Sequence, residues 1–159
     1  MRRVRLLATV PGISPGTLFQ LLTDFGRFPG VAPEIRSVLV HPPEHPGGPR
    51  HSDWEVNFRR GVLRWREWEH LDPVTASVEF GQTEGDFEHF RGTWRVTPDG
   101  SDCVVRFQVE FDFGIASLAE AMEPVADRLL RTAMGSVLSG LFGPDTQLHD
   151  YPLVERKTL

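Results

Sequence analysis

The sequence has one cysteine, one tyrosine and one lysine, and it has no long apolar run. The single cysteine, Cys103, excludes an intramolecular disulfide and a cysteine-based metal site, so we expect a small buried side chain. No stretch approaches the roughly 20 apolar residues of a membrane-spanning helix. The apolar run after the basic start Met1–Arg5 is too short for a secretory leader. We therefore expect a soluble, cytoplasmic protein whose first strand starts near Arg2.

An excess of positive charge is also lacking. The formal net charge is −5, which argues against a nucleic-acid partner. We find no glycine-rich nucleotide loop, no nucleophile elbow and no His-Glu metal motif, so redox, phosphoryl-transfer and hydrolytic classes have no support. The sequence predicts no cofactor and no metal.

Two strands and a helix near the end of the chain give the clearest structural pattern. Apolar residues fall on every second position in Phe90–Val96 and Cys103–Phe113, which predicts strands with one apolar face. The segment Ala116–Phe142 has a helical apolar stripe. The stripe consists of Leu118, Met122, Val125, Leu129, Ala133, Val137 and Leu141. A sheet packed against one long helix follows.

The rest of the chain adds short elements. We expect a short helix from Ser14 to about Thr23. The remaining expected strands are Arg2–Val10, Ile35–Val40, Ser52–Phe58, Val62–Leu71 and Val74–Phe80, with a loop at His41–Arg50. The predicted fold is α+β: a curved antiparallel sheet of about seven strands wraps around the long C-terminal helix, and short helices follow strand 1. Residues 1–143 would form one domain, and residues 144–159 an irregular tail.

Several segments carry a family resemblance through their order and spacing. They are Leu18–Pro29, Gly85–Phe87, Trp94–Val96, Asp112-Phe113 and Pro124–Arg128. In this respect the chain resembles the START-like, helix-grip (Bet v 1-like) superfamily, which includes polyketide aromatase/cyclases and coenzyme-Q-binding proteins. The resemblance implies a cavity for a hydrophobic ligand, either a polyketide or a quinone or lipid. For a polyketide it also implies an acyl carrier protein as a partner.

One predicted strand, Val62–Leu71, breaks the alternation. The face that holds Trp65 also holds Glu67 and Glu69, whereas the opposite face is equally mixed. If both carboxyls face the cavity, burial and mutual repulsion raise their pKa values, which suits the acid–base steps of an aldol cyclase. The alternative is a pair of solvated carboxylates beside neighbouring arginines.

The aromatase/cyclases that the chain resembles carry an arginine on the cavity face of this strand. Aligned on Asp72-Pro73, the corresponding residue here is Glu69, which puts that mechanism in doubt and favours a non-catalytic binder. Arg66 or Arg91 is a possible substitute cation, although each is read more simply as solvated.

We expect other residues to contact the ligand. These are the aromatic Trp65, Phe28, Trp54, Phe90, Trp94 and Phe107, together with Val109, Leu129, Thr132 and Ser136. The leading hypothesis is a polyketide aromatase/cyclase that binds a poly-β-ketone and directs its aldol cyclisation and dehydration, with Glu67 and Glu69 as the catalytic pair. The alternative is a chaperone or sequestration protein for a quinone, lipid or other hydrophobic natural product.

Overall fold

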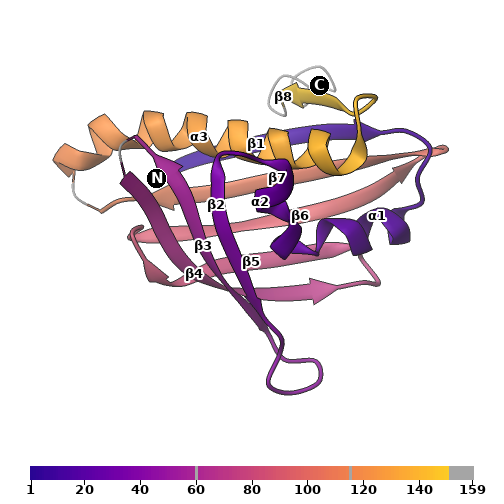
Figure 1. Ribbon diagram of the computed structural model, residues 1–159, viewed down its shortest axis with the longest axis horizontal. Helices are drawn as coiled ribbons and strands as arrows, with labels where there is room; N and C mark the ends of the chain where they lie inside the picture. Colours follow the sequence, from indigo (N-terminus) through magenta and orange to yellow (C-terminus); the bar gives the residue numbers. More distant parts are fainter. Residues whose placement is uncertain (60, 115, 151–159) are drawn as a thin grey trace.

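The computed structural model describes residues 1–150, apart from 60 and 115 (Figure 1). The strands are β1 (Arg2–Val10), β2 (Ile35–His41), β3 (Arg50–Phe58), β4 (Gly61–Asp72), β5 (Ser77–Gly85), β6 (His89–Asp99), β7 (Asp102–Asp112) and β8 (Gln147–Asp150). The helices are α1 (Pro15–Leu22), the single 3₁₀ turn η1 (Phe25–Arg27), α2 (Phe28–Val31) and α3 (Ala116–Phe142). Ser14 caps α1 by accepting a hydrogen bond from the backbone N–H of Thr17.

The eight strands form one antiparallel sheet in the order β2-β3-β4-β5-β6-β7-β1-β8. The sheet is curved and unclosed, and α3 runs along one side of it (Figure 1). Of the short helices after β1, η1 and α2 contact β2, and α1 contacts β6. The predicted helix-grip architecture is confirmed. An apolar sheet face and an apolar helix stripe each require a partner, and here each buries the other.

The alternation predicted for β6 and β7 is the register of the structure. Trp94 pairs with Phe107, and Phe90 pairs with Phe111, so the apolar positions of both strands share one face. β1 continues this face, because its Val4 lies opposite Val109. All six side chains are buried. This part of the sheet is the scaffold of the core.

The buried side of α3 differs from the predicted stripe. Over residues 121–142, where the side chains are described, its buried apolar side chains are Ala126, Leu130, Ala133, Met134, Val137 and Leu138, whereas Met122, Val125, Leu129 and Leu141 are only partly buried. The predicted Leu118 lies outside the described side chains. Two polar ties to β1 favour this rotation. Asp127 pairs with Arg2 at 2.8 Å, and the Arg131 guanidinium donates to the backbone oxygen of Arg5 at 3.0 Å. The helix is therefore rotated toward β1, and the side of the helix that holds Leu129 lies at the edge of the core.

Two further expectations were wrong. β5 does not start at Val74, because the Asp72 carboxylate accepts hydrogen bonds from the backbone N–H groups of Val74 and Thr75 and holds a turn there. Val74 is 93% exposed. The segment expected to be an irregular tail contains β8, which pairs with β1 and extends the sheet by one strand. Residues 151–159 lie outside the described residues.

Candidate functional site

β4 brings two carboxyl groups into the interior. Trp65, Glu67 and Glu69 are 3%, 2% and 0% exposed, so the expectation that this face points inward is confirmed. The neighbouring arginines, Arg64 and Arg66, lie on the outer face and pair with acidic residues of β3. The strand folds with this face inward because Arg64 and Arg66 pair with acidic residues on the solvent-exposed face while Trp65 is buried.

Glu69 is held by two residues of β3. Its Oε1 accepts a hydrogen bond from Nε of Arg50 at 2.6 Å, and its Oε2 accepts one from the Ser52 hydroxyl at 2.5 Å. Arg50 lies directly opposite Glu69 in the register, and Ser52 lies opposite Glu67. The Ser52 oxygen accepts in turn from Nε1 of Trp54 at 2.7 Å. Both oxygens of Glu69 therefore receive hydrogen bonds.

Glu67 has a different environment. Its Oε1 accepts from Nε1 of Trp65 at 2.8 Å. Burial raises the pKa of Glu67 well above its usual range, and the hydrogen bond and repulsion from Glu69 raise it further. The Trp65 N–H and the charge of Arg50 act in the opposite direction but are smaller. Glu67 is therefore a buried carboxyl that favours its protonated form.

Sequence reasoning missed Arg50, which it assigned to the end of a loop. The guanidinium lies 4.7 Å from the centre of the Phe25 ring, and its Nη1 donates to the backbone oxygen of Thr23 at 2.7 Å. The third nitrogen, Nη2, is buried and has no hydrogen-bond partner among the described residues. A signal was available, since the period of two in Trp54, Val56 and Phe58 extends back through Ser52 to Arg50.

The predicted aromatic wall forms one connected cluster. Trp54 and Trp65 are stacked with ring centres 5.4 Å apart, and Trp65 contacts Phe90 at 4.9 Å. The other predicted rings join through Phe28–Trp54 at 5.8 Å, Phe28–Trp94 at 6.3 Å and Trp94–Phe107 at 4.4 Å. Val109 is 1% exposed beside them. Because the rings touch one another, a ligand between α3 and the sheet must separate them.

Sequence reasoning also missed Phe25 and Phe87 as members of this cluster. Phe87 contacts Trp65 at 5.7 Å and Phe90 at 4.6 Å. The side chain of Gln82 holds the backbone of Phe87 at both ends: its Nε2 donates to the carbonyl at 2.7 Å and its Oε1 accepts from the N–H at 3.2 Å. This clamp fixes the ring in the connector between β5 and β6.

The residues predicted on α3 are not all brought to the cluster. Leu129 is partly buried and packs against the core. Ser136 is half-buried, and its hydroxyl donates to a Glu34 carboxylate oxygen at 3.4 Å. Thr132 is exposed. The prediction that Thr132 contacts the ligand was wrong, because the rotation of α3 toward β1 turns this residue to solvent.

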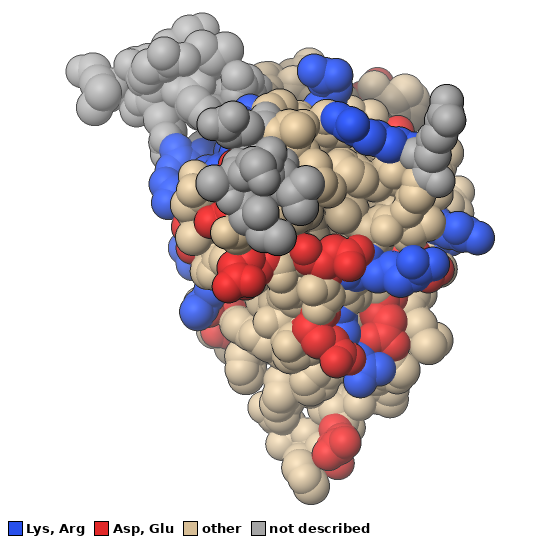
Figure 2. Space-filling model, turned by 90° about the vertical axis from the view of Figure 1, so that its left-hand side faces the viewer, with Lys and Arg blue, Asp and Glu red and all other residues tan. Residues whose placement is uncertain are grey.

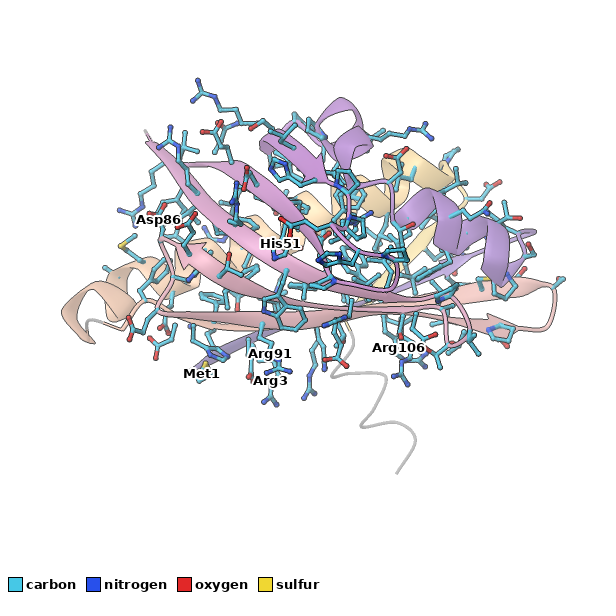
Figure 3. All side chains as sticks on the ribbon, turned by 90° about the horizontal axis from the view of Figure 1, so that it is seen from below. Met1, Arg3, His51, Asp86, Arg91 and Arg106 are labelled. Carbon is cyan, nitrogen blue, oxygen red and sulfur yellow. The ribbon has the colours of Figure 1, made fainter. Side chains whose placement is uncertain are left out.

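The other candidate cations stay outside. Arg66 pairs with Asp53 at 2.6 Å. Arg91 projects from the outer face of the sheet (Figure 3), near Glu79 and over the ring of Trp68. Neither arginine contacts the inward carboxyls, and the cation that contacts Glu69 is Arg50. Among the described residues, no three His, Cys, Asp or Glu side chains are placed to hold a metal, and no helix of this part is long and apolar enough to cross a membrane.

A sheet gripping one long helix, with buried carboxyls and an aromatic lining, defines an α+β helix-grip protein of the START-like class. Residues 12–137 match the model of the family described as "Polyketide cyclase / dehydrase and lipid transport", and the chain belongs to this family. No curated protein sequence matches the chain.

Solved structures share the fold. TTHA0849 from Thermus thermophilus is 25% identical with a TM-score of 0.77, covering 88% of this chain and 94% of its own. The Zhui aromatase/cyclase from Streptomyces sp. R1128 is 20% identical with a TM-score of 0.71, covering 86% and 90%. A START superfamily protein from Mycobacterium smegmatis is 17% identical with a TM-score of 0.65, covering 85% and 96%.

Proposed function

We propose that the protein is a polyketide cyclase that binds a poly-β-ketone between α3 and the sheet and directs its aldol cyclisation and dehydration. The observation that carries the proposal is the buried Glu67, whose pKa burial raises, beside an Arg50–Glu69 ion pair. A carboxyl that keeps its proton in an apolar enclosure is suited to general acid catalysis near neutral pH. The proposal includes a cytoplasmic location and delivery of the substrate by an acyl carrier protein.

The aldol step moves a proton at two sites of the substrate, the methylene group and the carbonyl oxygen. Aldol closure joins a methylene carbon to a carbonyl carbon, so the methylene group loses a proton and the carbonyl oxygen gains one. The methylene group would react as its enol: Glu67 would protonate the carbonyl oxygen as the carbon–carbon bond forms, and the resulting carboxylate would take the enol proton that the methylene group supplied. In dehydration Glu67 would protonate the departing hydroxyl and then take the proton of the neighbouring carbon, which leaves a double bond and water. The unpartnered Nη2 of Arg50 is a donor suited to the enol oxygen.

The aromatic cluster would hold the ketone chain. The ligand contacts that we propose are Trp65, Phe28, Trp54, Phe90, Trp94, Phe107 and Val109, with Leu129 and Ser136 on the flank of α3. Flat rings favour a chain that is becoming a planar aromatic ring, and apolar walls exclude the water that would otherwise release an unfinished product. Separation of touching rings is the conformational change that binding requires.

The test is a reconstituted polyketide synthase reaction that supplies a carrier-bound poly-β-ketone. We expect Glu67→Gln to abolish the directed product and to leave spontaneously cyclised products, because the amide cannot deliver a proton. Glu69→Gln and the double variant extend the series. Glu79→Gln, on the outer face, is the matched control. An unchanged product distribution with Glu67→Gln, Glu69→Gln and both together would contradict the carboxylate mechanism.

A non-catalytic binder of a quinone or lipid is the second candidate. Glu69 at the position where the aromatase/cyclases carry an arginine favours it, as does the lipid transport in the family description. Native mass spectrometry of protein purified without detergent distinguishes the two. A co-purifying quinone or lipid supports the binder, and release of that ligand by a poly-β-ketone analogue would return support to the cyclase.

A further inference from the structure

We propose that Arg50 is a positioning residue that decides which of the two buried carboxyls carries the proton: it holds Glu69 as the carboxylate, so that the proton of the pair stays on Glu67. The inference concerns the resting protein and is independent of any substrate. Its consequence for catalysis rests on the function proposed above.

The hydrogen bonds around Glu69 favour its carboxylate form. An indole N–H has no acceptor capacity, so the Trp54 N–H must donate to the oxygen of Ser52. The one hydroxyl proton of Ser52 then points to Oε2 of Glu69, at 2.5 Å. A guanidinium also only donates, and its Nε occupies Oε1 of Glu69. Both oxygens of Glu69 therefore accept, as those of a carboxylate do.

The contact between the two carboxyls then has only one consistent direction. Glu67 and Glu69 lie close enough to interact, and a hydrogen bond between two carboxyls needs one proton. Because Arg50 and Ser52 already donate to the two oxygens of Glu69, we place this proton on Glu67. The Trp65 N–H on Oε1 of Glu67 leaves the other oxygen of Glu67 to carry it. Glu67 donates, and Glu69 accepts a third hydrogen bond.

Charge balance gives the same answer. The buried group of Arg50, Glu67 and Glu69 contains one cation, Arg50. It is therefore neutral when only one of the two carboxyls is ionised. The residues opposite Glu69 and Glu67 on β5 are Phe80 and Gln82, and neither is charged. The Phe25 ring and the carbonyl of Thr23 beside the guanidinium are also neutral. A second ionised carboxyl would have no partner here.

This arrangement gives Glu67 its behaviour during turnover. When Glu67 gives its proton to a carbonyl oxygen, the pair holds two negative charges against one guanidinium. That imbalance makes Glu67 a base that takes back the enol proton that the methylene group supplied. One residue can therefore act first as the acid and then as the base, with no net change in its protonation over the aldol step.

Infrared spectroscopy of the substrate-free protein tests the inference, because a protonated carboxyl has a carbonyl band that a carboxylate lacks. We expect a band of a buried carboxylic acid at neutral pH that Glu67→Gln removes and Glu79→Gln does not. Arg50→Met should roughly double its area, since Glu69 without a cation takes up a proton. Arg50→Lys should restore the wild-type band. The last result separates the charge of Arg50 from its packing.

Two outcomes would overturn the inference: a buried-acid band that survives in Glu67→Gln, or a folded Arg50→Met protein whose band is unchanged. If Arg50→Met fails to fold, Arg50→Gln takes its place, and an unchanged band in that folded protein would overturn the inference in the same way. These spectra need no substrate. A failed cyclase assay with the expected spectra would therefore reject the proposed function and leave the proton assignment standing.

Discussion

The pair of strands β3 and β4 carries arginine–carboxylate pairs on both of its faces. The inner pair is Arg50–Glu69, whose side chains are 13% and 0% exposed. The outer pair Arg66–Asp53 has the same N–O distance, 2.6 Å, but its side chains are 43% and 37% exposed. Arg64–Glu55 is a second outer pair. The same type of ion pair, between the same two strands, thus lies in a buried environment on one face and in water on the other.

The difference shows where function belongs. On the outside, water competes with each partner, and acidic and basic side chains lie interspersed over the surface (Figure 2). An exposed pair of this kind contributes little to stability. On the inside, water does not solvate an unpaired charge, so Arg50 and Glu69 must pair with each other. Breaking the pairs on the two faces should therefore have very different results.

The largest expected effect comes from removing one partner of the inner pair. Glu69→Leu removes the carboxylate that the buried Arg50 guanidinium contacts, and we expect the free energy of unfolding to fall by about 3–5 kcal/mol. Urea denaturation measures this. The double variant Arg50→Met/Glu69→Leu should recover most of the loss, since two apolar side chains replace the two charges. A single variant as stable as the double variant would contradict the account.

A smaller loss is expected where one hydrogen bond of the network disappears. Trp54→Phe keeps an aromatic ring but removes the N–H that donates to Ser52 at 2.7 Å. We expect the free energy of unfolding to fall by about 1–3 kcal/mol, because the buried Ser52 oxygen loses its donor. Phe58→Leu, on the same strand but without a polar contact, controls for altered ring packing. Equal losses in both variants would leave the hydrogen bond without a measurable role.

Glu67→Gln should change the pH dependence of stability more than stability itself. The pKa of Glu67 is raised in the folded protein, so the folded state binds a proton that the unfolded state releases above the ordinary value of 4.5. Wild-type stability therefore falls as the pH rises from there through the raised pKa. The amide does not titrate, so the variant should lack this fall. Near pH 5 we expect the two proteins to agree within about 1.5 kcal/mol.

Urea denaturation at about pH 5 and about pH 8 gives the comparison, because the stability of the wild-type protein should fall as the pH rises above the ordinary pKa of Glu67. The variant should be the more stable protein at the higher pH. A wild-type protein whose loss of stability with pH persists unchanged in Glu67→Gln would locate the responsible group elsewhere.

The fold was predictable from the sequence where a period was long and clean. In Cys103–Phe113 every second side chain is apolar, and the alternating buried face of β7 follows directly. The inward position of Glu67 and Glu69 was also within reach, since Trp65 anchors the face. The rotation of α3 was not, because it depends on ties between Asp127 and Arg2 that join residues 125 positions apart.

The site was only half predictable for a similar reason. Two carboxyls on an apolar face are visible in one strand, but their partner is visible only in the pairing of two strands. Arg50 stands next to a proline-rich loop, and its composition suggests solvent. The register that sets it opposite Glu69 depends on where β3 begins. A local pattern can give the face of a residue, but not which residue of the next strand lies against it.

The smallest effect is expected from the outer pair. Arg66 and, to a lesser extent, His41 hold the pKa of Asp53 at about 2, below its ordinary value of 3.8. The stabilisation from this carboxylate is therefore complete above the ordinary value and is lost as the pH falls through about 2. Asp53→Asn should match wild type in urea denaturation near neutral pH, because water screens the pair. A loss as large as that of Glu69→Leu would show that burial is not what separates the two faces of β3 and β4.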